Sequence, residues 1–186
     1  MKGDARVKAI NAVVSALMLV LLAVHGLGNS LQLFGVGSVL PAAIGWALAV
    51  LAVAHMAIGC ALTVSTLREQ ARAGTAYWRL NRRFWAVRLS GLAIAVFVVC
   101  HVLIFAQLDP TAPVRLSYFG PLQLAVSLLL AISLAVHVLA NLQPLMISLG
   151  IPSPRGRAAD LGVVFALMLL IAALAFVVYF VRWSVM

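Results

Sequence analysis

Five separate apolar runs dominate this 186-residue sequence, and each is long enough to cross a lipid bilayer, which takes about 20 helical residues. The chain is 65% hydrophobic and only 9% charged, whereas a soluble domain has about 25% charged residues. These proportions exclude a soluble enzyme, a secreted disulfide module and a disordered tail. The sequence predicts an all-α integral membrane bundle, one domain over residues 1–186, with spans at Ala9–Leu33, Leu40–Leu67, Trp85–Leu108, Gly120–Ile147 and Leu161–Arg182.

The positive charge is concentrated at alternate connections between the spans. The net charge is +9, and of the 13 Lys and Arg only Arg115 and Arg182 fall on the other side. This is the positive-inside bias of a multi-pass protein, so a nucleic-acid partner is not needed to explain it. We expect a bacterial or archaeal cytoplasmic (inner) membrane protein whose N-terminus and loops 68–83 and 150–158 are cytoplasmic.

Two further features of the chain narrow its chemistry. Cys60 and Cys100 lie within apolar runs and belong to no CxxC or CxxCH motif, so covalent haem attachment, a thiol zinc site and a disulfide framework have no support. The first run follows a basic stretch, as in a signal peptide. It is too long for one and no small-residue cleavage site follows it, so we interpret it as a retained span.

The four histidines of the chain lie one in each of the first four spans, and the fifth span has none. They are His25, His55, His101 and His137. An ionisable side chain inside a membrane helix is costly and indicates a functional site, although a single one can also serve a structural hydrogen bond between helices. The distribution of one histidine to each of four helices favours a function.

The depth of each histidine in its span predicts two pairs. The alternating direction of the spans brings His25 to the same outer level as His101, and His55 to the same inner level as His137, with about 6–10 Å between the levels. Two facing imidazoles on two helices are suited to hold the iron of a haem from both faces. The sequence therefore predicts two b-type haems with bis-histidine ligation in a four-helix bundle formed by the first four spans.

Other uses of four histidines fit less well. Zinc requires ligands that converge on one point, and these lie at two depths. A proton relay normally includes an acid within the membrane, and all the acids of this chain lie at or beyond span ends: Asp4, Glu69, Asp109 and Asp160.

Several residues near the histidines suit a haem environment. Arg88, Ser90 and Gly91 open the third span, and Arg88 is placed to meet a haem propionate. Ordinary helix packing explains small and polar residues beside the histidines equally well; these are Gly26, Gly28, Gly59, Ser133 and Asn141. Polar residues at the outer ends of spans would serve the outer haem or a quinone; these are Asn29, Gln32 and Gln107.

Over nearly its whole length the chain resembles the di-haem cytochrome b membrane-anchor subunit of succinate dehydrogenases and fumarate reductases, the succinate:quinone oxidoreductases. The stretch Asn81–Gly91, NRRFWAVRLSG, followed ten residues later by His101, is similar to the opening of the family's third helix. The stretch Ile147–Arg155, ISLGIPSPR, is similar to its turn between helices four and five. The one-histidine-per-helix layout with a ligand-free fifth helix is also the family's.

The resemblance implies a role in electron transport. His55 and His137 would ligate the proximal haem and His25 and His101 the distal one. The chain would connect the flavoprotein and iron–sulfur subunits, which carry the dicarboxylate chemistry, to a membrane quinone such as menaquinone. Ala135 stands two residues before His137, where some members carry a glutamate linked to transmembrane proton transfer, so that coupling is in doubt. The direction of flux, succinate oxidation or fumarate reduction, is left open.

Two other classes stay open from the residues alone. The chain would also suit the cytochrome b anchor of another quinone-linked dehydrogenase or reductase, because the sequence does not reveal its partner. A haem-free membrane transporter or scaffold is the second alternative, and a haem assay distinguishes it.

Overall fold

The structure is a computed structural model that describes residues 2–36, 40–74, 82–106 and 118–185. The described residues form five helices: α1 (Lys2–Leu33), α2 (Ala42–Arg72), α3 (Arg82–Phe105), α4 (Pro121–Ser148) and α5 (Pro154–Val185). All five are long and apolar enough to cross a membrane. The fold is therefore the all-helical, five-span arrangement that the apolar runs predict.

The helices extend beyond the predicted spans where polar residues follow apolar ones. The first begins at Lys2 instead of Ala9, and the fifth begins at Pro154 instead of Leu161. Apolar runs mark only the part of a helix that lies in hydrocarbon, whereas helical hydrogen bonding continues into the polar boundary. Proline also favours the first turn of a helix because its missing N–H has no partner there.

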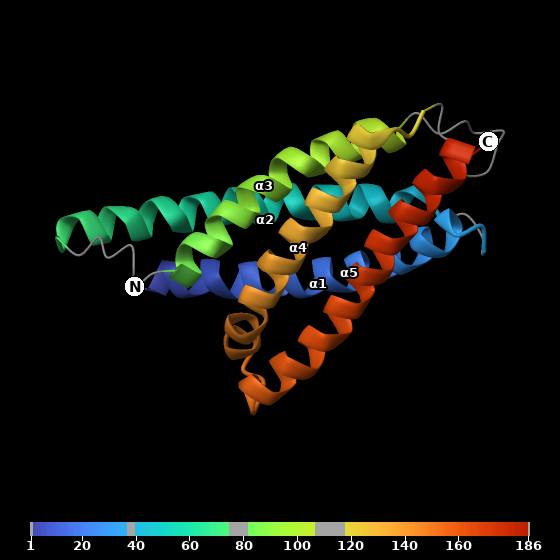
Figure 1. Ribbon diagram of the computed structural model, residues 1–186. Coiled ribbons are helices and arrows are strands. Elements are labelled where there is room, and N and C mark those ends of the chain that lie inside the picture. The colour runs from blue at the N-terminus through green and yellow to red at the C-terminus, as the bar shows by residue number, and fades with distance from the viewer. Residues whose placement is uncertain (1, 37–39, 75–81, 107–117, 186) are drawn as a thin grey trace.

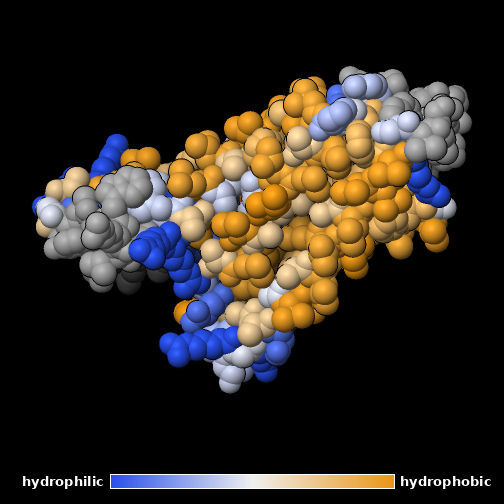
Figure 2. Space-filling model, viewed as in Figure 1, coloured by the Kyte–Doolittle hydropathy of each residue, from blue (hydrophilic) through white to orange (hydrophobic). Residues whose placement is uncertain are grey.

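The starts of α1, α3 and α5 and the ends of α2 and α4 lie toward one end of the molecule, which we call the basic end (Figure 1). Hydrophilic side chains are concentrated toward the ends of the molecule, with a broad hydrophobic band between them (Figure 2). This distribution is the one expected of helices whose middle parts face lipid.

The close helix contacts define which helices are neighbours. α4 packs against α3 and α5, while α1 packs against α2, α5 and, less extensively, α4. Helices α1 to α4 thus form a group to which α5 adds on the side of α1 and α4 (Figure 1).

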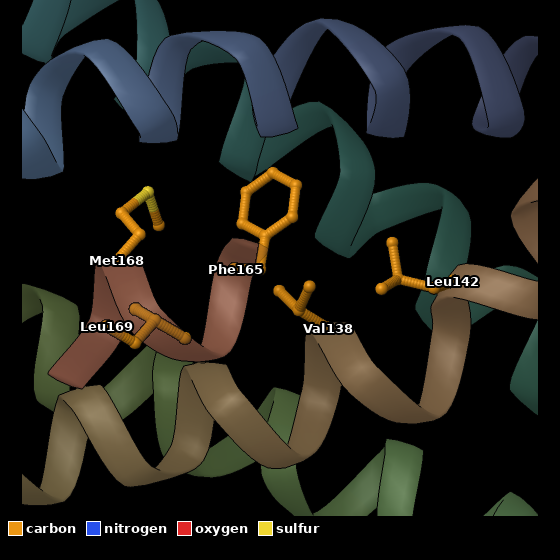
Figure 3. Close-up of a cluster of buried hydrophobic side chains, with 5 residues drawn as sticks. All are labelled: Val138, Leu142, Phe165, Met168 and Leu169. Carbon is orange, nitrogen blue, oxygen red and sulfur yellow. The ribbon is translucent and has the colours of Figure 1, made fainter. Parts of the chain in front are cut away.

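The densest apolar packing lies between α4, α5 and α1. Val138 and Leu142 of α4 meet Phe165, Met168 and Leu169 of α5, all at most 7% exposed (Figure 3). Across from them, α2 contributes no buried residue among those described, and α3 contributes only Ser90. The helices that carry His55 and His101 therefore take little part in the apolar core.

A proline inside α4 is compensated by an arginine from α3. Pro144 has no N–H to donate to the carbonyl of Ala140, four residues earlier, and such a loss normally weakens a helix. Arg83 donates to that carbonyl from Nε at 2.9 Å and from Nη2 at 2.7 Å. This pair of hydrogen bonds joins α3 to α4 at the basic end.

The opposite end is closed by a second arginine. Gly35 adopts a positive φ of 82°, and Val36 donates to the carbonyl of Leu31 at 2.8 Å, which ends α1 in a tight left-handed turn. Arg182 of α5 donates to the carbonyl of Phe34 at 2.7 Å. The last turn of α5 is thereby attached to the end of α1.

Candidate functional site

The four histidines lie in two pairs inside the helix group. The rings of His55 and His137 have centroids 6.1 Å apart and planes at 88°, and we call them the near pair because they lie closer to the basic end. The rings of His25 and His101 have centroids 6.3 Å apart and planes at 70°, and we call them the far pair. These are the two pairs that the depths of the histidines predict.

Each pair connects two helices that are not close neighbours. The near pair joins α2 to α4 and the far pair joins α1 to α3, and neither combination is among the extensive helix contacts of the described residues. The rings therefore meet across the interior of the four-helix group. Imidazoles that met only to support helix packing would be expected between helices already in contact.

The ring separation suits one metal atom between two imidazoles. A metal–nitrogen bond is about 2 Å long, and the centre of an imidazole lies about 1 Å behind its nitrogen. Two rings that bind one metal from opposite sides therefore have centroids about 6 Å apart. Both pairs meet this distance, and the described residues include no hydrogen bond between the two rings of either pair.

Two serines fix the orientation and the tautomer of the near pair. Ser15 of α1 donates its only proton to the carbonyl of Asn11 at 2.7 Å, so its oxygen accepts from His55 Nδ1 at 3.2 Å. His137 Nδ1 lies 3.2 Å from the carbonyl of Val87, which only accepts, and 3.2 Å from the Ser90 hydroxyl. In both rings Nδ1 carries the proton, so the lone pair is on Nε2, the atom free to bind a metal.

The far pair has fewer polar partners. Asn29, one turn after His25 on the same helix, places its side-chain amide 3.1 Å from His25 Nδ1. A ligating Nε2 requires the amide oxygen on that side, which a half-turn of the amide provides. His101 Nδ1 is buried without a hydrogen-bond partner, and its ring packs on Phe105 with centroids 4.6 Å apart.

A glycine on a neighbouring helix faces one histidine of each pair. A Cβ added at Gly91 of α3 would lie 3.3 Å from Cε1 of His137, and one added at Gly45 of α2 would lie 3.6 Å from Cε1 of His25. Each of these helices therefore supplies a histidine at one level and a glycine at the other. A larger side chain at either position would press on the ring.

The register of α2 corrects the expected distance between the two levels. Gly45 lies at the far pair and His55 belongs to the near pair, and ten residues of helix correspond to about 15 Å. The prediction of about 6–10 Å was too small. It measured depth from the last apolar residue of each run, but the helices continue by different lengths past those residues, as α2 does to Arg72.

Arg88 adds a positive charge beside the near pair. Its guanidinium lies 4.9 Å from the centre of the Phe84 ring, and it is within electrostatic range of both His55 and His137. Its Nε is buried without a hydrogen-bond partner. A buried cationic donor with an unused N–H suits an anionic group such as a haem carboxylate.

The structure assigns different contacts to several predicted residues. Ser90 and Gly91 contact the His137 ring itself, which makes them supports of the histidine. Of the glycines expected beside the histidines, Gly26 faces Met168 of α5, as helix packing requires, and Gly59 faces open space. Gln107 lies outside the described residues.

Sequence reasoning missed Ser15 and Gly45. No spacing links Ser15 to His55, which lies forty residues further along the chain. Gly45 did leave a signal, because it precedes His55 by ten residues just as Gly91 precedes His101. The repeated glycine–histidine spacing in α2 and α3 marks the two levels of the site.

Each pair contributes two imidazoles as possible metal ligands. The described residues include no group of three or more His, Cys, Asp or Glu that could hold a metal ion. Two imidazoles suffice only when another group fills the remaining coordination positions, as a macrocycle does.

A comparison with known proteins finds no match, whether among protein families, curated proteins or solved structures.

Proposed function

We propose that this chain is a di-haem cytochrome b, the membrane anchor of a succinate dehydrogenase or fumarate reductase complex, which passes electrons between an iron–sulfur subunit and membrane quinone. The observation that carries the proposal is the occurrence of two imidazole pairs with centroid separations of 6.1 and 6.3 Å across the interior of the helix group. The similarity of residues 81–91 and 147–155 to that family supports the choice of complex.

The two b-type haems, when bound, supply reversible one-electron transfer at iron. His55 and His137 would hold one iron, and His25 and His101 would hold the other. Iron held by two protein imidazoles would be suited to electron transfer and not to binding a substrate. The chain therefore conducts electrons, and the dicarboxylate chemistry belongs to the flavoprotein subunit.

The residues around the near pair prepare it for a haem before the haem arrives. Ser15 and Ser90 hold the two rings with Nε2 unprotonated. The tautomer that can bind a metal is therefore already selected, and haem binding would not be weakened by the cost of changing it. Gly91 leaves room for the His137 ring. Arg88 offers its unused N–H to a propionate and raises the affinity of the site for an electron by its positive charge.

The two levels form a path along the bundle. By the positive-inside rule the basic end faces the cytoplasm, so the near pair is the closer one to a soluble iron–sulfur partner. The far pair lies about 15 Å further along the helices, toward the opposite face. We assign quinone, with menaquinone as the first choice, to a site in this membrane domain.

The test uses the tagged chain expressed in its own host and purified in mild detergent with whatever partners stay bound. Succinate added to the anaerobic complex should reduce the b-type haem signals, and a menaquinone analogue should reoxidise them. The same preparation carrying His137→Ala is the control, because it interrupts the path between the two levels without touching a soluble subunit.

Three results have distinct meanings. Haem that succinate or quinol reduces, in a complex with flavin and iron–sulfur centres, supports the proposal. Two bound haems with a different dehydrogenase as partner would keep the cytochrome and refute the succinate or fumarate assignment. A chain without haem, from cells with ample haem supply, would refute the electron-transfer function altogether.

A further inference from the structure

A hollow at the basic end is lined by none of the four histidines. Its volume is about 460 Å³, and it is shallow and broadly open. It is lined by residues of three helices: Arg83, Leu139, Ala140, Gln143, Arg155, Ala158 and Ala159. No acidic residue is among these lining residues, and the two arginines give the hollow a positive charge.

One of the two arginines is held in place by the backbone. Arg83 gives two of its donors to the Ala140 carbonyl that Pro144 leaves without a partner. A guanidinium has five donors, so the others remain for a ligand. The entropy cost of ordering the Arg83 side chain is therefore offset by these hydrogen bonds when the protein folds. A ligand that binds later does not have to order this side chain.

The positions of the arginines add the field of two helix ends. Arg83 is the second residue of α3 and Arg155 the second residue of α5. The positive ends of both helix dipoles therefore lie at the hollow, beside two cationic side chains and the amide of Gln143. This combination suits a phosphate group, with several donors arranged around its oxygens.

The other wall of the hollow is apolar. Leu139, which is 44% exposed, and the three alanines have no side-chain hydrogen-bonding groups for a small hydrated ion. They match the glycerol and first methylene groups of a phospholipid, and the hollow lies where the apolar spans of α4 and α5 give way to polar residues. Basic pockets between membrane helices at such a level bind anionic headgroups.

We propose that this hollow binds the phosphate of an anionic phospholipid at the basic end of α3, α4 and α5. The site does not rest on the haem assignment, because its lining includes neither a histidine nor a residue that we place beside the near or far pair. A bound lipid would bridge the start of α3 to the start of α5 and reinforce the junction that Arg83 makes with α4.

The test titrates the full purified chain, stripped of lipid in mild detergent at 0.15 M salt, with three ligands. These are short-chain phosphatidylglycerol, phosphatidylcholine of the same chain length and inorganic phosphate, with binding followed by calorimetry and native mass spectrometry. We expect one phosphatidylglycerol per chain and a preference over phosphatidylcholine. Arg155→Gln should weaken that binding about fivefold, the effect of one arginine at a membrane surface.

Arg157→Gln is the matched control, because Arg157 lies two residues further on the same helix and does not line the hollow. It should change the affinity less than about twofold. If Arg155→Gln fails to fold, Arg83→Lys, which keeps the charge, and Gln143→Leu, which keeps the helix, are further variants and should also weaken phosphatidylglycerol binding.

Three outcomes would overturn the proposal. Equal binding of the two lipids would remove the role of the anionic headgroup. Inorganic phosphate that binds as tightly as phosphatidylglycerol would make the hollow a site for a free anion. An equal loss in Arg155→Gln and Arg157→Gln would reduce it to a diffuse surface charge.

Discussion

The near and far pairs have nearly the same ring separation but very different surroundings. In the near pair a serine on a neighbouring helix lies within hydrogen-bond distance of each Nδ1, and Arg88 stands close by. In the far pair His25 has one amide from its own helix, and His101 has no partner at Nδ1 and packs on Phe105 and Phe176. If each pair holds an iron as proposed, the ligands are alike, and any difference between the two irons would come from these surroundings.

The comparison distinguishes residues that would bind a metal from residues that would set its reduction potential. In the proposed cytochrome the histidines would determine how many irons bind, whereas hydrogen bonds to Nδ1, nearby charge and burial would determine how readily each iron accepts an electron. The near pair would combine two opposing influences, because the hydroxyls make the imidazoles better electron donors while the charge of Arg88 would favour a reduced iron. The far pair has an apolar setting with few such influences.

The largest effect is expected from removing a ligand. His137→Ala should eliminate the near haem and leave the far one, and His101→Ala should do the reverse, so each variant keeps about half of the haem. Pyridine haemochrome assay against protein concentration measures this. Ser133→Ala, one turn before His137, is the control and should keep both haems. Loss of both signals, or of neither, in each histidine variant would contradict the pairing.

The glycines test whether the rings need the space that the structure gives them. Gly91→Val should lower near-site haem affinity about tenfold or more, and Gly45→Val should act on the far site alone. The readout is site-resolved haem occupancy from low-temperature spectra. Valine at Gly59, where the structure has open space, is the matched control. An equal loss from all three variants would mean that valine merely disturbs the helices.

The charge of Arg88 should affect the midpoint potential of the near haem and not that of the far haem. Arg88→Gln removes a cation near His55 and His137, which is expected to lower the midpoint potential of the near haem by about 40–80 mV and leave the far haem unchanged. A redox titration of the two haem signals measures the shift. Arg88→Lys should retain most of the potential, and a shift in the far haem alone would reverse our assignment of Arg88.

The serine hydrogen bonds should give the smallest shift. Ser15→Ala or Ser90→Ala is expected to raise the near potential by about 20–40 mV, because a neutral hydrogen bond contributes about 1 kcal/mol and its loss makes the imidazole a weaker donor. Ser127→Ala is a suitable control, since Ser127 is buried in α4 and donates only to Gln123. A shift as large in that control would show that the serines act through packing.

The sequence predicted the parts of the site that depend on one helix at a time. The approximate spans and the pairing of the four histidines follow from counting along each run, because a membrane fixes where the apolar part of every helix begins and ends. Ser15 could not be found in this way, since its contact depends on how α1 and α2 are rotated against each other. The role of Arg83 likewise depends on α3 lying beside Pro144 of α4.

The predicted distance between the two histidine levels was too small for a related reason. Hydropathy locates the apolar part of a helix, but the rise between Gly45 and His55 is a property of the helix itself and gives the distance directly. The repeated ten-residue spacing between glycine and histidine, taken as a helical rise, corresponds to about 15 Å.

The most direct test of the central claim is low-temperature electron paramagnetic resonance of the purified, oxidised chain, combined with its haem content. We expect about two b-type haems per chain, both low-spin, with two distinguishable signals because the surroundings of the pairs differ. A single haem, a high-spin iron with an open axial position, or no haem at all would contradict the assignment of both histidine pairs as iron ligands.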